Sequence, residues 1–69
     1  MKRSETPTET WNIQSRPNGE WRWLEWGQFD YSDATYLKVE SDLKIRATQN
    51  GTSYRVLDGH NHIVFQATP

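Results

Sequence analysis

The sequence predicts a small α+β domain in which two β-hairpins flank one helix, in the order ββαββ. Two segments alternate apolar and polar residues on either side of a turn sequence, and a central segment repeats apolar residues at helical spacing. The length of 69 residues allows one domain at most. Nine residues are aromatic, four of them Trp, and such large side chains can build a core at a hydrophobic content of 33%. We therefore expect a single domain over residues 10–69.

Residues 1–9 contain Ser, Thr, Glu, Pro and charged residues, but no large apolar residue beyond Met1. Such a segment buries too little apolar surface to offset the entropy lost on ordering. We expect residues 1–9 to be a disordered tail.

The first hairpin is predicted to join residues 11–15 to residues 20–23 through the turn sequence Pro17-Asn18-Gly19. Pairing of Arg16 with Glu20 places one apolar set on a single sheet face: Trp11, Ile13, Trp21 and Trp23. The opposite face then carries polar residues together with Leu24. Trp26 belongs to that opposite face by parity or folds back under the helix, and the sequence leaves both placements open.

Residues 32–50 are predicted to form the helix that covers the apolar face. One helical stripe carries Tyr36, Val39, Leu43 and Ala47, and further support comes from a Ser32 N-cap, a C-terminal Gly51 and the pairs Glu40–Lys44 and Asp42–Arg46. The alternative is a small all-β barrel or meander, because several of these residues also share strand parity and Asn50-Gly51 suits a hairpin turn. That alternative places Arg46 opposite Arg55, an unfavourable pair, so we prefer the helix.

The second hairpin is predicted to join residues 54–57 to residues 62–65. Pairing of Leu57 with His62 sets Val56 opposite Ile63 and Tyr54 opposite Phe65. The predicted core then combines the helical stripe with eight sheet residues: Trp11, Ile13, Trp21, Trp23, Tyr54, Val56, Ile63 and Phe65.

The loop of this hairpin holds the only residues from which a metal site or a catalytic site can be argued. His60 and His62, two residues apart, point the same way on a strand and can share a metal with Asp58. Turn geometry accounts for the same residues without a metal. No glycine-rich phosphate loop and no nucleophile-elbow sequence is present. We therefore assign no catalytic residue, metal or cofactor, and expect a protein that is not an enzyme.

Charge and cysteine content indicate the class of partner and the cellular compartment. Eight Lys and Arg stand against nine Asp and Glu, a formal net charge of −1, which argues against nucleic acid as a partner. The sequence has no cysteine, no apolar run of membrane-spanning length and no segment that resembles a signal peptide. We expect a cytoplasmic protein that does not contact a membrane.

The uncovered sheet face provides the candidate binding site. Exposed Trp, Arg and aliphatic side chains together are typical of binding hot spots. The predicted partner-binding residues are Arg22, Leu24, Trp26, Arg55, Leu57 and Val64. We expect a non-enzymatic module that binds another protein as an inhibitor or adaptor, like the short accessory proteins of phages and mobile elements. The alternatives are a single-stranded nucleic-acid binder that stacks bases on Trp26, and a homodimer that completes an undersized core.

Overall fold

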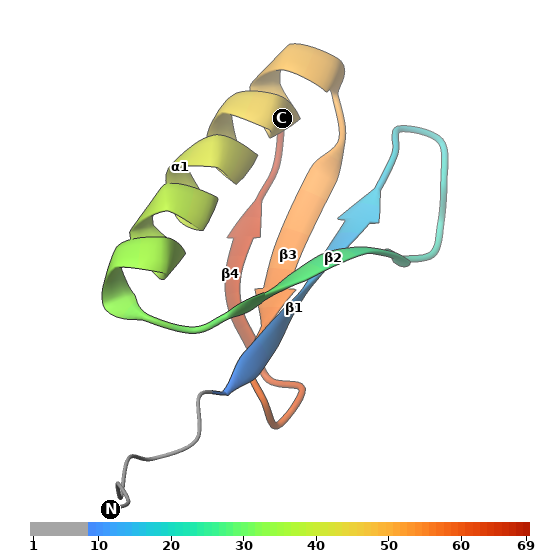
Figure 1. Cartoon of the computed structure of the whole chain (residues 1–69). Coiled ribbons are helices and arrows are strands. Elements are labelled where there is room, and N and C mark those ends of the chain that lie inside the picture. Colours follow the sequence, from blue (N-terminus) through green and yellow to red (C-terminus); the bar gives the residue numbers. More distant parts are fainter. Residues whose placement is uncertain (1–8) are drawn as a thin grey trace, which may run out of the picture.

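The computed structural model describes residues 9–69 and shows a four-stranded antiparallel sheet with one helix against it (Figure 1). The elements are β1 (Thr10–Arg16), β2 (Leu24–Asp30), α1 (Asp33–Asn50), β3 (Ser53–Leu57) and β4 (Ile63–Ala67). The strands lie in the order β2-β1-β3-β4. The predicted ββαββ domain is confirmed, and the all-β alternative is wrong.

Local signals set both ends of α1. The backbone N–H of Thr35 donates to Ser32 Oγ at 3.1 Å, which caps the first turn. At the other end Gly51 adopts φ 70°, a left-handed conformation that favours glycine, and its N–H donates to the Ala47 carbonyl at 3.0 Å. Both caps were predicted. Within residues 9–69, no helix combines the length and the apolar composition that crossing a bilayer requires.

The cap gives a first prediction, for the stability of the helix. Replacing Ser32 with alanine removes the side-chain acceptor of the Thr35 N–H, and is expected to lower the free energy of unfolding by about 1 kcal/mol. The matched control is Ser41→Ala, because Ser41 is exposed within the same helix and alanine is a better helix former. Urea denaturation of the three proteins measures the difference. Equal losses in both variants would show that the cap contributes nothing.

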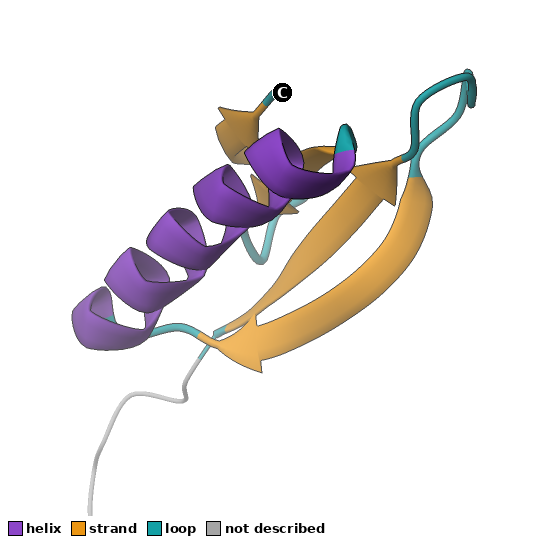
Figure 2. Cartoon of the chain, turned by 90° about the horizontal axis from the view of Figure 1, so that it is seen from above, coloured by secondary structure: helices purple, strands orange, loops and turns teal. Residues whose placement is uncertain are grey.

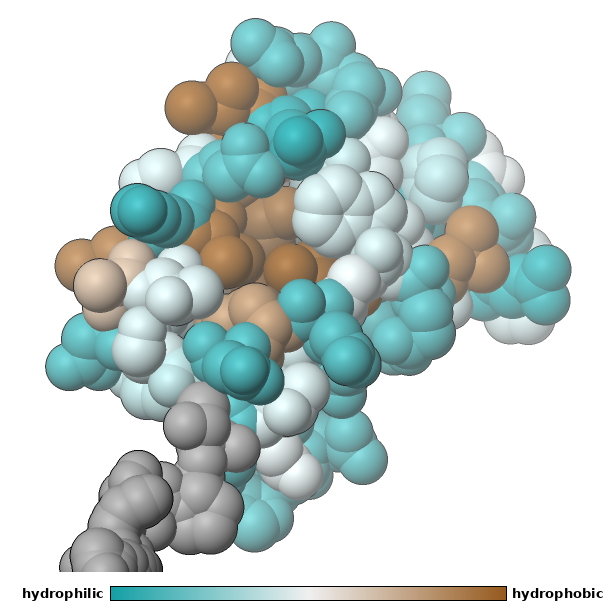
Figure 3. Space-filling model, viewed as in Figure 1, coloured by the Kyte–Doolittle hydropathy of each residue, from teal (hydrophilic) through white to brown (hydrophobic). Residues whose placement is uncertain are grey.

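The core lies between α1 and the sheet, as the helical stripe predicted. Figure 2 shows α1 running along one side of the sheet, and in Figure 3 hydrophobic residues gather at the centre of the face seen in Figure 1. Two cations flank the buried residues of the helix. The ammonium of Lys44 lies 5.8 Å from the ring centre of Phe65, and the guanidinium of Arg46 lies 5.3 Å from that of Trp26. The buried core consists of Ile13, Leu43, Ala47, Tyr54, Val56 and Ala67, with Trp11, Phe29, Val39 and Phe65 packed around it.

The first hairpin contains the predicted turn but not the predicted pairing. The N–H of Glu20 donates to the Pro17 carbonyl at 2.9 Å, and Gly19 has φ 90°. Strand pairing starts only with Ser15 opposite Leu24, so residues 17–23 form a wide connection. Trp21, predicted in the core, is 83% exposed.

A bulge in β2 then changes which residues face the helix. Ile13 pairs with Gly27 and Gln14 pairs with Glu25, which leaves Trp26 as the extra residue. The ring of Trp26 packs edge-on against Tyr54, with centres 5.4 Å apart, on the helix side of the sheet. Leu24 lies opposite Ser15, a buried neighbour of the core, and so shares the helix side.

The second hairpin also differs in register from the prediction. Leu57 pairs with Ile63 and Val56 pairs with Phe65, so Val64 is the extra residue of a second irregularity. The shift moves Ile63 out of the predicted core, where it is 53% exposed, and brings Ala67 into it. The shift follows from the loop, where the N–H of Asp58 donates to the carbonyl of His62 at 2.9 Å, so the ladder resumes only at Ile63.

Glu9 joins the N-terminal end of the domain to its aromatic residues. The indole N–H of Trp11 donates to Glu9 Oε1 at 2.8 Å, and the backbone N–H of Tyr31 donates to the Glu9 carbonyl at 2.8 Å. The rings of Trp11 and Tyr31 stack with centres 4.1 Å apart. Glu9, included in the predicted tail, thus contacts the domain, whereas the rest of that prediction lies outside the described residues.

Candidate functional site

The sheet face away from α1 is covered by no other element within residues 9–69 (Figure 2). The strand register assigns residues to this face, since partners directly opposite one another share a face. We call it the open face. It comprises Thr10, Asn12, Gln14 and Arg16 of β1, Glu25, Gln28 and Asp30 of β2, Ser53, Arg55 and Leu57 of β3, and Ile63 and Gln66 of β4.

Two arginines on the open face share one tryptophan ring. The guanidinium carbon of Arg55 lies 4.4 Å from the ring centre of Trp23, and that of Arg16 lies 5.4 Å from it. Arg55 Nε donates to Gln14 Oε1 at 2.7 Å, and Gln14 Nε2 donates to Glu25 Oε2 at 2.8 Å. We call these five residues the Arg–Trp cluster. Trp23 was predicted in the core, and that prediction is wrong.

The wide connection between β1 and β2 accounts for the position of Trp23. Because pairing does not begin until Leu24, Trp23 is free of the strand and its ring lies against the arginines of the open face. A cation over an aromatic ring is stabilised by about 0.5–2 kcal/mol, depending on how dry the contact is. Trp23 and Arg55 are both half-buried, so this contact holds the arginine head group in place.

The other end of the open face is apolar. Leu57 lies opposite Asn12 on one side and Ile63 on the other, and is only 8% exposed. Leu57 was predicted to be an exposed residue of the uncovered face, and its burial shows that this expectation is wrong. Ile63 and Val64, which follow the loop of the second hairpin, are the exposed apolar residues at this end.

The structure does not bring the six predicted binding residues together. Arg55 and Leu57 lie on the open face, and Val64 lies at the irregularity of β4. Leu24 lies on the helix side, which corrects its predicted placement. Trp26 also lies on the helix side, which is one of the two placements that the sequence left open. Arg22 lies in the connection, its Nε 3.9 Å from Glu20 Oε1. Whether any of the six binds a partner stays a prediction.

Sequence reasoning missed most of the Arg–Trp cluster as a site. Parity did place Gln14 and Arg16 on the polar face, but strand parity alone assigned Trp23 to the core. The one available signal was Gly27, since an isolated glycine within a strand pattern often marks a bulge.

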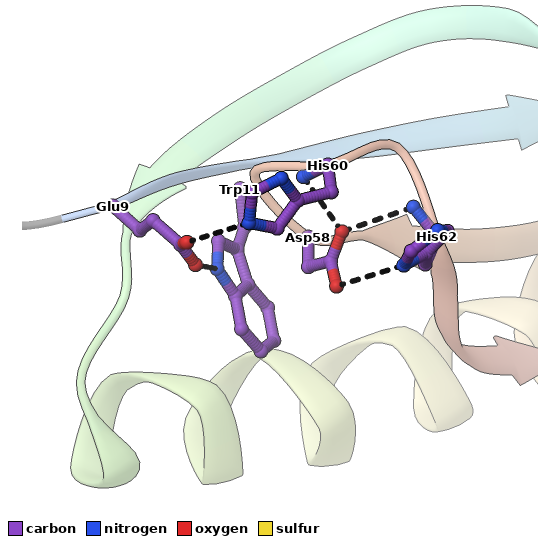
Figure 4. Close-up of polar contacts among 5 residues, drawn as sticks. All are labelled: Glu9, Trp11, Asp58, His60 and His62. Atoms are coloured by element: carbon purple, nitrogen blue, oxygen red, sulfur yellow. Dashed lines mark hydrogen bonds and ion pairs between the residues drawn. The ribbon is translucent and has the colours of Figure 1, made fainter.

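In the loop of residues 58–62, the Asp58 carboxylate accepts hydrogen bonds from the loop backbone (Figure 4). Asp58 Oδ1 accepts from the backbone N–H of His60 at 2.8 Å and of His62 at 2.9 Å. The rings point to different carboxylates, with His62 Nδ1 3.8 Å from Asp58 Oδ2 and His60 Nε2 3.8 Å from Glu9 Oε2. In the part of the chain that the structure describes, no three His, Asp or Glu residues are grouped to hold a metal. The expectation that no metal binds here stays a prediction.

The hydrogen bonds of Asp58 to the loop backbone give a second prediction, for the effect of low pH on stability. The backbone N–H of His62, followed by that of His60, stabilises the ionised form and lowers the pKa of Asp58. A carboxyl with a lowered folded-state pKa stabilises the fold above its unfolded value of about 3.9, and loses that effect as pH falls through the folded value. Asp58→Asn is therefore expected to be less stable than the wild type at pH 7, with the difference shrinking below about pH 4. Thermal melts of both proteins across this range provide the measurement. A difference independent of pH would contradict it.

Comparison of the chain with protein-family models, with curated proteins and with solved structures found no match.

Proposed function

We propose that this chain is a small non-enzymatic binding module that docks its open face on a larger protein, as an inhibitor or an adaptor. One observation carries the proposal: the helix leaves a sheet face uncovered that holds two arginines ordered on one tryptophan. Tryptophan and arginine are the residue types most enriched in binding hot spots. Their mutual contact supports binding because a side chain already held in place loses little entropy when a partner arrives.

The two ends of the open face suit different parts of a protein surface. The Arg–Trp cluster offers guanidinium groups that form bidentate hydrogen bonds with carboxylates. Ile63, at the far end, offers apolar surface that a partner can cover. A polar anchor beside an apolar contact is the usual composition of a protein interface.

Affinity capture with matched variants tests the proposal. The open-face variant is Arg55→Glu with Ile63→Glu, and the control is Lys38→Glu with Leu37→Glu on the exposed surface of α1. The two double variants change the net charge equally, and circular dichroism verifies that both are folded. We expect the wild type and the control to capture the same protein from a lysate of the source cells in stoichiometric amount, and the open-face variant to lose it.

Three results would contradict the proposal. The first is capture that the open-face variant retains. The second is a calibrated mass of a dimer that falls to a monomer in the open-face variant, which favours the homodimer. The third is a mass increase on adding an oligonucleotide, which favours single-stranded nucleic acid.

A further inference from the structure

We infer that the partner surface is acidic, and that carboxylate side chains of an exposed segment bind Arg16 and Arg55. The inference rests on the proposed function, because it names the chemistry that the open face recognises. Three observations support it: the two arginines have no carboxylate partner within residues 9–69, a cavity adjoins Arg16, and the ring of Trp23 is already in contact with both guanidinium groups.

Neither arginine has a carboxylate partner within residues 9–69. The ion pairs of this part of the chain involve Arg22, Arg46 and the two histidines. The carboxylate of the cluster, that of Glu25, accepts from the Gln14 amide instead. Two positive charges therefore lie on one ring in a protein whose net charge is −1. Such a pair attracts carboxylates of a partner and disfavours basic surfaces.

A cavity at the end of the open face adjoins Arg16. Its volume is about 160 Å³, and its walls are formed by Arg16, residues 17–20 of the connection, Gly51, Ser53 and Pro69. Arg16 Nε is buried and has no hydrogen-bond partner within residues 9–69. A buried donor without an acceptor is unfavourable, and a carboxylate that entered the cavity would supply one to the guanidinium group.

The same geometry favours carboxylates over a nucleic-acid backbone. Single strands bind where aromatic rings are free to stack on bases. Within the Arg–Trp cluster the Trp23 ring already contacts two guanidinium groups, and the exposed ring of Trp21 lies outside the cluster. Glu20 lines the cavity and Glu25 lies in the cluster, and both repel any anion, but an acidic protein segment can space its carboxylates around these two charges, whereas the phosphates of a strand follow at a fixed spacing. Separate carboxylates of an extended acidic segment fit between these charges.

Binding of poly-L-glutamate tests the inference directly. The probe is titrated at pH 7 and low salt while NMR follows the Nε–H signals of the arginines and the indole N–H of Trp23. We expect shifts at Arg16, Arg55 and Trp23, and no shift at Arg46, which is paired with Asp42 at 2.8 Å. The variant Arg16→Gln with Arg55→Gln is expected to bind roughly tenfold more weakly or worse.

The control variant is Arg22→Gln with Lys38→Gln, which removes the same charge from exposed positions outside the cluster. It is expected to retain affinity within about threefold, as rim charges contribute little to affinity. Arg16→Lys with Arg55→Lys keeps the charge but loses bidentate pairing, and is expected to bind several-fold more weakly than the wild type. Equal losses in the cluster variant and the control would overturn the inference, because they would show attraction by net charge alone.

The inference and the proposed function fail in different ways. An oligo(dT) strand of matched charge that binds through the cluster more tightly than poly-L-glutamate would overturn both. Absence of poly-L-glutamate binding, with a captured partner still dependent on Arg55 and Ile63, would overturn only the acidic partner. Cluster-dependent binding of poly-L-glutamate, with capture retained by the open-face variant, would support the acidic preference and contradict the proposed interface.

Discussion

Replacement of Leu43 by alanine is expected to lower the free energy of unfolding by about 2–5 kcal/mol, the usual range for a buried leucine. Leu43 is 1% exposed and belongs to the cluster that joins α1 to the sheet. Its loss removes apolar contacts and leaves a cavity under the only helix of the described chain. A core of this size supplies about 3–5 kcal/mol of stability in total, so the expected loss is comparable with the whole stability of the domain.

Leu37→Ala is the matched control for this prediction. It is the same substitution in the same helix, but Leu37 is 59% exposed, and the expected change is within about 0.5 kcal/mol. Urea titrations followed by circular dichroism measure both variants against the wild type. Equal stability of the two variants would mean that the helix does not bury the stripe containing Leu43.

The helix was predictable from the sequence because every signal that defines it is local. Ser32 and Gly51 lie next to the ends that they cap, and the apolar stripe repeats at a spacing that places it on one side. The pair Asp42–Arg46 lies one turn apart and forms as expected, with Nε and Oδ2 separated by 2.8 Å. The pair Glu40–Lys44 does not form an ion pair, because Lys44 extends over Phe65 of β4. That last contact joins distant segments, and no local pattern shows it.

The registers of the two hairpins were not predictable, because each depends on one extra residue. Trp26 in β2 and Val64 in β4 interrupt the alternation, and a shift of one residue moves every later side chain to the other sheet face. Alternation in the sequence shows that a strand has two faces, but it does not show where pairing begins. The late start of β2 and its bulge put Trp21 and Trp23 outside the core and Trp26 toward the helix.

The candidate site was predictable only where parity within a single strand decides the position of a residue. Arg55 and Leu57 were predicted on the uncovered face by parity within β3, and the structure places them there. The Arg–Trp cluster depends instead on how Trp23 meets residues of β1 and β3 across the sheet. Contacts among three separate segments leave no pattern in any one of them.

The burial of Leu57 on the open face leads to the last prediction. Leu57 and Ile63 are direct partners across β3 and β4, yet Leu57 is 8% exposed and Ile63 is 53% exposed. Leu57→Glu places a carboxylate where water is excluded, and is expected to lower the free energy of unfolding by more than about 2 kcal/mol. Ile63→Glu leaves its carboxylate in water. It is expected to lower the free energy of unfolding by less than about 1 kcal/mol, which corresponds to the small apolar area that Ile63 buries.

Acid distinguishes burial of the new carboxylate from a mere loss of leucine packing. In the buried position of Leu57 the pKa of the introduced carboxyl rises above its unfolded value of about 4.3, because desolvation disfavours the ionised form. The penalty is then full at neutral pH and shrinks as pH falls through the raised folded-state value. Urea titrations from pH 7 to about pH 4 are therefore expected to show Leu57→Glu recovering stability relative to Leu57→Gln, its uncharged counterpart. Ile63→Glu and Ile63→Gln are expected to keep a constant difference over most of this range. If Leu57→Glu matches Ile63→Glu in stability and pH dependence, Leu57 is exposed on the open face and directly available to a partner.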